Sequence, residues 1–273
     1  MSMGNGAIFL DLDGCLFSED GGIDEMYYES FGWLSRYIRE ANVGRHPQIR
    51  FCSGRNIPFV EATSLFIGRP LSSLMVIENG IALYDPNTKC APIYTPGVTE
   101  EMRALFAVIL RKKVPKILKR YPGLCCLPGN LMAITLNQKF DSVVDIESIR
   151  DNLARHELKN LVLERRVRII CSQQTVSIVP PHVNKGTAVE FLAEKEEIDL
   201  GASLGIGDSK ADIPFLEKMR FVGCPANADK ACKDYINSKS GSKKASHFSY
   251  AAAVVDIICE FAGIKPPDFL SKF

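Results

Sequence analysis

Short apolar segments that end in polar residues alternate with helical patterns in the first third of this chain, and this alternation limits its fold more than any other feature. The apolar segments are residues 6–10, 48–52 and 74–77, and the helical patterns between them are residues 25–40 and 58–67. Continuous apolar runs of this length are typical of strands buried on both faces. Strand, helix, strand, helix, strand predicts a parallel, doubly wound sheet.

The pattern changes in the middle of the chain and returns near the end. The middle contains a helix at 99–121 interrupted near Pro115, strands at 124–127 and 131–136, a helix at 145–156 and a hairpin of 167–171 with 175–179. The last part predicts helices at 185–195, 213–218, 228–236 and 251–261, strands at 202–206 and 221–224, and a mobile, lysine-rich loop at 236–247. We therefore expect an α/β chain, in which an α+β unit at residues 84–181 is inserted into a sheet domain formed by residues 1–83 and 182–273.

Composition fits a two-domain protein of 273 residues, with 46% apolar and 24% charged side chains. The longest apolar run, residues 104–110, is far shorter than the roughly 20 residues that span a bilayer, and no signal peptide is evident, so we expect no membrane partner. Nine cysteines without a CxxC pair indicate reduced thiols in a cytoplasmic protein. Nothing in the sequence predicts the oligomeric state.

The charge is nearly balanced overall but unevenly distributed. The net charge is +1, which implies no nucleic-acid partner, and the sequence has no GxxxxGK[ST] phosphate-binding loop. Residues 84–181 hold 15 lysines and arginines against 9 acidic residues. This excess suits an anionic substrate, although a solvated helix face explains most of these charges equally well.

Polar residues follow the expected strands at positions that would meet at one edge of the sheet. They are Asp11 and Asp13, Ser53, Glu78 and Asn79, Asp208 and Asp212, with Lys185 at the start of a helix. Ligands of open α/β sheets bind in the crevice beyond the carboxyl ends of the strands. Each residue alone also has a structural explanation, such as a turn, a helix cap or a surface lysine. Their shared position favours a functional site.

The order of these motifs resembles that of the haloacid dehalogenase superfamily, in the Cof-type branch with a compact α/β cap between its second and third motifs. The motifs are Asp11–Leu12–Asp13–Gly14, Ser53–Gly54–Arg55, Asn184–Lys185–Gly186 and Gly207–Asp208–Ser209–Lys210–Ala211–Asp212. The resemblance covers essentially the whole chain. It implies a hydrolase that cleaves a phosphate monoester.

The resemblance assigns a role to each motif residue. Asp11 is implied as the nucleophile, which forms an aspartyl-phosphate, and Asp13 as the general acid and base. Residues two apart on a strand point to the same side, which suits this pair. Lys185 is the implied catalytic cation. The phosphate-binding residues implied are Ser53, Gly54, Arg55, Lys185 and Asn227.

A magnesium ion is the cofactor that the resemblance implies. Its ligands would be Asp11, the Asp13 carbonyl, Asp208 and Asp212, because Mg²⁺ prefers oxygen ligands. Two positions depart from the family pattern. Cys15 stands where threonine is commoner, and Ala211 stands where asparagine usually precedes the last aspartate. The second departure bears on how Asp212 takes part in metal binding.

The expected function is hydrolysis of a small phosphorylated metabolite, such as a sugar phosphate or a short phosphorylated acid. Specificity residues are expected in the loops 130–132 and 172–174 of the inserted segment, and at Arg55. Two alternatives remain open. A phosphomutase could use the same machinery, and a non-catalytic metabolite-binding protein could retain the fold, although it would not need the acid at Asp13.

Overall fold

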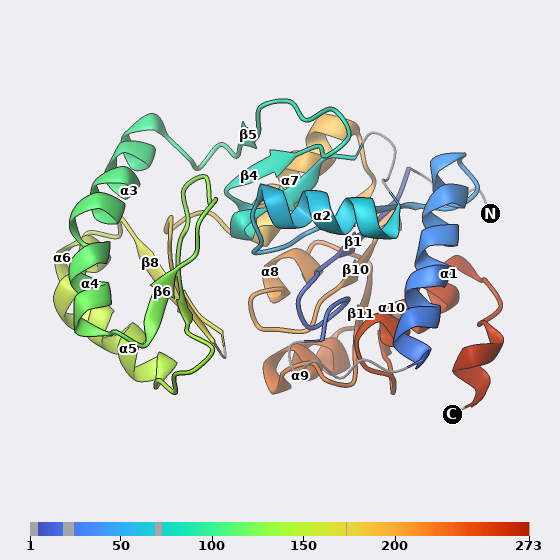
Figure 1. The fold of residues 1–273 in the computed structure, drawn as a ribbon. Coiled ribbons are helices and arrows are strands. Elements are labelled where there is room, and N and C mark those ends of the chain that lie inside the picture. The colour runs from blue at the N-terminus through green and yellow to red at the C-terminus, as the bar shows by residue number, and fades with distance from the viewer. Residues whose placement is uncertain (1–4, 19–24, 69–72, 173, 273) are drawn as a thin grey trace. The chain divides into compact units, whose positions relative to one another are not determined.

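The chain forms two compact units. The computed structural model describes residues 5–18, 25–68, 73–172 and 174–272. The first unit comprises Met1–Ile93 and Asn184–Phe273, and the second comprises Tyr94–Val183 (Figure 1). The expected insertion, 84–181, begins ten residues before the second unit begins and ends two residues before the second unit ends. Those expected bounds stay a prediction. In the described parts of the chain, no helix is both long and apolar enough to cross a bilayer.

A parallel sheet forms the centre of the first unit. Its strands, in spatial order, are β12 (Lys243–Ala245), β11 (Phe221–Cys224), β10 (Leu204–Ile206), β1 (Ala7–Leu10) and β2 (Gln48–Phe51). A parallel bridge from Cys52 to Val76 leads to β3 (Met75–Ile77), which pairs antiparallel with β4 (Ala82–Tyr84), next to β5 (Ile93–Tyr94). The strand order reverses direction beside β1. The expected doubly wound α/β fold is confirmed.

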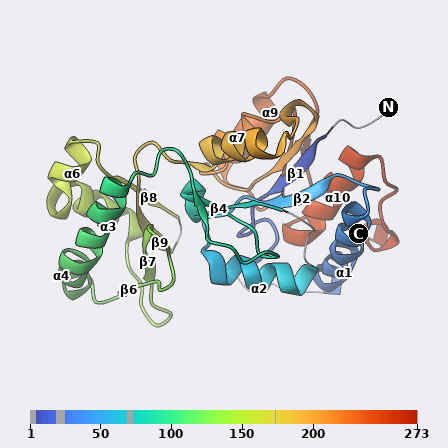
Figure 2. The same ribbon diagram turned by 90° about the horizontal axis from the view of Figure 1, so that it is seen from above.

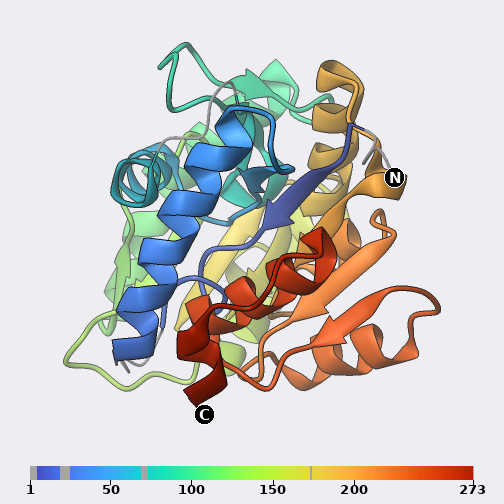
Figure 3. The same ribbon diagram turned by 90° about the vertical axis from the view of Figure 1, so that its right-hand side faces the viewer.

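Helices cover both faces of this sheet. They are α1 (Glu25–Asn42), α2 (Ile57–Ile67), α7 (Lys185–Glu196), α8 (Ile213–Leu216), α9 (Lys230–Ser238) and α10 (Tyr250–Ala262). Figure 2 shows α7 and α9 on one side of the sheet and α1, α2 and α10 on the other, and Figure 3 shows α1 beside α10. This arrangement matches the alternation of strand and helix segments in the sequence.

Adjacent sheet residues pack on opposite layers. Phe9, Val222 and Cys224 are buried in the same apolar cluster as the inward residues of α7, α8 and α9. Gly223, between two of them, faces the other layer, where an added Cβ would lie 2.6 Å from Ile257 of α10. A larger side chain would push α10 off the sheet, so both layers depend on the small residue at this position.

The expected loop at 236–247 is wrong for residues 236–238 and 243–245. Helix α9 continues to Ser238, and β12 then pairs in parallel with β11, with Lys243 opposite Val222. Backbone hydrogen bonds from Val222 N to Ser242 O and from Ser246 N to Cys224 O hold it there. Lysines are common on edge strands because their charge blocks pairing with another chain. A polar, lysine-rich segment is therefore compatible with an edge strand as well as with a loop.

The second unit is an antiparallel sheet with helices. Its elements are α3 (Glu100–Lys112), α4 (Val114–Arg120), β6 (Leu124–Cys126), β7 (Ile134–Gln138), α5 (Ile146–Asn152), the π-helical turn η2 (Leu153–Glu157), α6 (Lys159–Leu163), β8 (Arg168–Cys171) and β9 (Thr175–Val179). The strand order is β6-β7-β9-β8. The expected succession of helix, two strands, helix and two strands is confirmed, with the helix break at Lys113, just before Pro115.

Candidate active site

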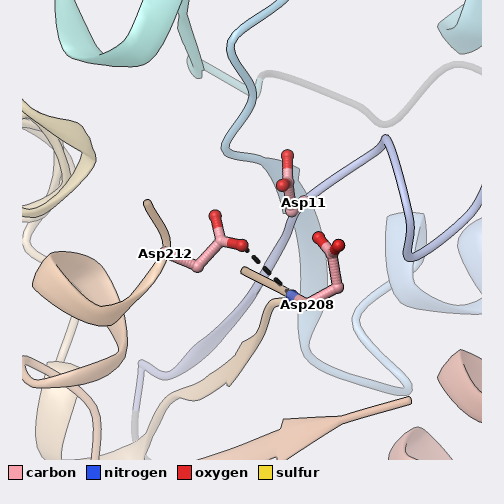
Figure 4. A group of neighbouring side chains, drawn as sticks. All are labelled: Asp11, Asp208 and Asp212. Carbon is pink, nitrogen blue, oxygen red and sulfur yellow. Dashed lines mark hydrogen bonds between the residues drawn. The ribbon is translucent and has the colours of Figure 1, made fainter. Parts of the chain in front are cut away.

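Three aspartates of the first unit meet where its strands end. Asp11 directly follows β1, Asp208 lies two residues beyond β10, and Asp212 closes the turn that Asp208 begins. One oxygen of each carboxylate lies within 4.8 Å of the others, and Asp11 and Asp212 are buried (Figure 4). Parallel strands bring these residues together because their carboxyl ends share one edge of the sheet. The expected meeting of these three residues is observed.

Lys185 joins two of the three carboxylates. Its Nζ lies 2.8 Å from Asp11 Oδ2 and 2.5 Å from Asp212 Oδ1, and its side chain is 4% exposed. The lysine is the first residue of α7, which begins with a reciprocal cap between Asn184 and Thr187. This cap fixes the start of the helix and with it the root of the lysine side chain.

Burial and neighbouring charges oppose each other at this pair. Burial raises the pKa of the Asp11 carboxyl and Asp212 raises it further; the Lys185 ammonium lowers it, but the net shift is upward. Burial lowers the pKa of Lys185, but the two carboxylates outweigh it and the net shift is upward. Lys185 therefore stays protonated.

The cluster is rich in carboxylates. Three of them lie together, and the Lys185 ammonium contacts two, Asp11 and Asp212. All the converging donors are oxygens, the ligand type of Mg²⁺. The donor type fits a divalent cation bound by Asp11, Asp208 and Asp212.

The turn at residues 207–212 is built around Asp212. Its Oδ2 accepts hydrogen bonds from Asp208 N at 3.1 Å, from Ser209 N at 2.9 Å and from Ser209 Oγ at 2.9 Å. Ala211 is exposed and takes no part in these contacts. Asp212 is therefore positioned without the asparagine that the family pattern leads us to expect at position 211, and Ser209 supplies part of the support.

Asp13 lies beside the cluster and is held by Arg55. Arg55 Nε donates to Asp13 Oδ2 at 2.7 Å and Nη2 donates to Oδ1 at 2.6 Å, and the guanidinium stacks 4.5 Å from the centre of the Phe59 ring. Both side chains remain partly exposed, Asp13 at 27% and Arg55 at 41%. The two-point pair fixes the carboxylate while leaving it accessible.

Gly14 permits Asp208 to approach the motif. The glycine has φ of +74°, and a Cβ there would lie 2.2 Å from Asp208 Oδ2. Only glycine takes this left-handed conformation readily, and only glycine leaves the space that the carboxylate occupies. Cys15 comes next, and its buried thiol lies 4.0 Å from Asp208 Oδ1. Burial, then Asp208, raise the pKa of this thiol, so it stays protonated.

Asn227 holds the Gly14 turn rather than projecting a free amide. Its Nδ2 donates to Gly14 O at 2.8 Å, and its Oδ1 accepts from Tyr250 N at 3.0 Å. These contacts link the motif of Asp11 to the first turn of α10. The side chain was expected to bind phosphate, and the structure shows it bound to backbone groups.

Ser53 and Gly54 follow β2 at the same edge of the sheet. Leu10 pairs with Phe51, so both strands end together. The buried Ser53 hydroxyl accepts a hydrogen bond from Arg55 N at 3.1 Å. Gly54 packs against Asn79, whose left-handed backbone (φ +58°) reverses the chain after β3. Ser53 thereby shapes the turn that presents Arg55.

The expected specificity loops lie in the second unit and make local contacts. Asn130 Nδ2 donates to Ala133 O at 2.9 Å and to Thr135 Oγ1 at 3.2 Å. Ser172 Oγ lies 2.8 Å from Thr175 Oγ1, and Gln173 is outside the described residues. These bonds stabilise turns. The proposed part of both loops in specificity stays a prediction.

Known proteins resemble this chain in sequence and in fold. The family model of haloacid dehalogenase-like hydrolases matches residues 129–246, which include Lys185, Asp208 and Asp212. A phosphoglycolate phosphatase of Thermoplasma volcanium is 24% identical over 256 residues, 93% of this chain and 97% of that protein.

Solved structures share the fold. A haloacid dehalogenase-like hydrolase from Bacteroides thetaiotaomicron superimposes with a TM-score of 0.65 at 13% identity, covering 94% of this chain and 99% of the other. The sucrose-phosphatase of Synechocystis, solved with sucrose and phosphate, gives 0.62 at 17% identity, covering 94% and 98%. The matched family model and the shared fold together support a haloacid dehalogenase-type hydrolase.

Proposed function

We propose that this protein is a magnesium-dependent phosphatase that hydrolyses a small phosphorylated metabolite. One observation carries the proposal: the buried carboxylate of Asp11 is held by the Lys185 ammonium, 2.8 Å away, inside a cluster of three carboxylates. A carboxylate fixed in this way can attack phosphorus, and converging carboxylate oxygens suit a divalent metal.

Asp11 is the proposed nucleophile. Its Oδ1 accepts a hydrogen bond from Leu12 N at 2.8 Å and its Oδ2 contacts Lys185, so both oxygens are oriented. Attack on phosphorus forms an acyl phosphate and breaks the bond to the ester oxygen. The positive charge of Lys185 lies near the transferring phosphoryl group. It therefore stabilises the negative charge of the transition state.

Asp13 is the proposed acid and base. In the first step its carboxyl donates a proton to the leaving oxygen, which departs as an alcohol. In the second step the resulting carboxylate takes a proton from water, and the water oxygen attacks phosphorus and releases phosphate from Asp11. Asp13 ends protonated, as it began. Its partial exposure suits contact with both the leaving group and water.

The metal ligands proposed are Asp11, Asp208, Asp212 and the backbone carbonyl of Asp13. When bound, Mg²⁺ supplies positive charge that stabilises the phosphoryl group during transfer. The residues of the turn at 207–212 prepare this site, because Ser209 and the backbone orient Asp212.

Phosphate recognition is proposed for Ser53, Gly54, Arg55 and Lys185. Arg55 is the strongest of these candidates. Its guanidinium is partly exposed, and arginine in general binds carboxylate and phosphate groups through two parallel hydrogen bonds. Asn227 contributes indirectly, through its bond to Gly14 O. The relatives named above act on phosphoglycolate or carry the name sucrose-phosphatase, which supports a small phosphorylated metabolite as the class of substrate. The role of the second unit as a cap stays a prediction.

The decisive experiment measures hydrolysis of p-nitrophenyl phosphate with Mg²⁺ by the wild type and by Asp11→Asn. The wild type should release p-nitrophenolate, and the variant should show no turnover above background. The control is Asp234→Asn, which removes a 64%-exposed carboxylate on α9 and should keep full activity. Thermal melting of both variants checks the fold. Full activity of a folded Asp11→Asn protein would refute the nucleophile assignment.

A further inference from the structure

The second unit contains a cavity of about 450 Å³. Its walls come from α5 and η2, from α6 and the residues between it and β8, from the start of β8 and from the residues after β9. Helices α5 and α6 and strand β8 are labelled in Figure 1, and β9 is labelled in Figure 2. Every lining residue belongs to the second unit, whereas the carboxylate cluster belongs to the first. The cavity is therefore built from residues separate from the proposed catalytic group.

The charged lining residues are mainly basic. Three arginines, Arg150, Arg165 and Arg168, line the cavity together with one acid, Asp151. With His182 neutral, the lining carries a formal charge of +2. Asp151 is already shared, since its Oδ1 lies 2.9 Å from Arg150 Nη2 and its Oδ2 lies 3.8 Å from Arg155 Nη2.

Arg165 and Arg168 have no acidic partner in the part of the chain that the structure describes. No carboxylate there lies within ion-pair distance of either guanidinium. Arg168 Nη2 donates to Val183 O at 3.1 Å, next to His182 on the cavity wall. Arg168 is exposed as a residue, and desolvation of its guanidinium against the cavity wall lowers the pKa of that group. An anion would offset this desolvation, because arginine binds phosphate and carboxylate at two points.

The remaining walls are mostly apolar. Five of the ten lining residues are hydrocarbon side chains, namely Ala154, Val162, Val167, Ile169 and Pro181. The volume lies within the range of about 300–1,000 Å³ that is usual for small-molecule sites. Apolar walls with a few cationic groups suit a ligand with an organic body and a doubly negative head.

We propose that this cavity binds a small organic dianion, whose charged group contacts Arg165 and Arg168 and whose body packs against Val162 and Ile169. The formal charge of +2 on the lining suggests a ligand with two negative charges, and the cavity volume limits the size of that ligand. A phosphate monoester and a dicarboxylate share this chemistry. The proposal concerns binding in the second unit and does not depend on the hydrolytic function.

Calorimetric titration of the full-length protein tests the proposal. The probes are phenylphosphonate, whose carbon–phosphorus bond a phosphatase does not cleave, isophthalate as the dicarboxylate, and neutral benzyl alcohol. EDTA is present throughout to suppress metal-dependent binding elsewhere. We expect at least one dianion to bind, more weakly as salt rises, because screening reduces the attraction between charges.

Variants locate the binding. The double variant Arg165→Ala/Arg168→Ala should raise the Kd at least tenfold, and the single exposed change Arg165→Ala should raise it severalfold. The control Arg111→Ala/Lys112→Ala removes the same charge from exposed positions on α3 and should leave the Kd unchanged. Thermal melting confirms that the variants are folded, and Arg165→Ala replaces the double variant if that one is unfolded.

The outcomes separate clearly. Tighter binding of phenylphosphonate than of isophthalate would identify a phosphate head group, and the reverse would identify a dicarboxylate. Three results would overturn the proposal: no dianion binds, the cavity variants bind as the wild type does, or the α3 control loses as much affinity as they do. If benzyl alcohol binds as tightly as the dianions do, the cavity recognises only the apolar body of a ligand, and the proposal is also contradicted.

Discussion

Arg55 donates two hydrogen bonds to the Asp13 carboxylate, one from Nε at 2.7 Å and one from Nη2 at 2.6 Å, although the two residues are 42 positions apart in the chain. The Phe59 ring supports the guanidinium from one side. The proposed acid and base is therefore oriented by a cation that is itself accessible to a phosphate. Arg55 is a positioning residue for Asp13 and a candidate ligand of the substrate.

Replacing Arg55 should separate these two contributions. Arg55→Ala should lower kcat/KM for p-nitrophenyl phosphate by about 10- to 100-fold, because both the orientation of Asp13 and a phosphate contact are lost. Arg55→Lys keeps the charge but cannot form the two-point pair, so we expect an intermediate value with most of the loss in kcat. Steady-state kinetics measures both parameters. Arg45→Ala, an exposed position, is the control, and an Arg55→Ala enzyme as active as this control would exclude Arg55 from both roles.

Lys185 should matter for stability as well as for activity. Lys185→Met leaves Asp11 and Asp212 buried with no ammonium between them, and breaking such a buried pair costs about 3–5 kcal/mol of unfolding free energy. Urea denaturation in metal-free buffer measures this loss. Lys218→Met is the matched control, because its 2.7 Å pair with Glu190 lies at the surface and should contribute about 0–1 kcal/mol. Equal losses of unfolding free energy in the two variants would mean that the buried contacts of Lys185 stabilise the fold no more than a surface ion pair does.

Metal removal should stop turnover, and Mg²⁺ should also stabilise the folded protein. A ligand that binds only the native state raises its melting temperature, so added Mg²⁺ should shift the wild type upward. Asp208→Asn removes one carboxylate of the cluster and should weaken this shift, whereas Asp234→Asn should keep it. Differential scanning calorimetry with EDTA and with Mg²⁺ tests both points. Turnover that continues in EDTA would contradict the proposed metal site.

The layout of the site could be predicted from the sequence because it depends on strand ends. Asp11 and Asp208 each follow a short apolar run, and parallel strands bring such positions to one edge. Side-chain partners were harder to predict. Phosphate binding by the amide of Asn227 stays a prediction, and its bond to Gly14 O could not be predicted, since local sequence does not indicate which backbone group lies opposite.

The edge of the sheet was the main error in the fold. Lys243 and Lys244 made residues 236–247 look like an exposed loop, and the pairing with β11 that makes them a strand is a long-range contact. Hydrophobic periodicity gives no signal for a strand that lies at an edge and is largely solvated. The support of Asp212 by Ser209 was missed for a different reason: a serine in a turn ordinarily bonds nearby backbone.

Gly14 offers a test of how tightly the motif is packed. A Gly14→Ala change faces two penalties, a left-handed backbone at φ +74° and a Cβ 2.2 Å from Asp208 Oδ2. Gly44 has nearly the same backbone, φ +77°, with no atom within 4 Å of the added carbon. Gly44→Ala should therefore lower the unfolding free energy by about 1–2 kcal/mol, the usual penalty for a left-handed residue. Gly14→Ala should lower it further and also reduce activity.

The difference between the two variants measures the crowding at Asp208 alone, because the backbone penalty cancels. If Asp208 moves to make room, the enzyme should need more Mg²⁺ for half-maximal rate, while Gly44→Ala should keep the wild-type requirement. Urea denaturation gives the stabilities, and a magnesium titration of p-nitrophenyl phosphate hydrolysis gives the requirement. Equal stability and equal magnesium dependence in the two variants would show that the contact between Gly14 and Asp208 does not constrain the site.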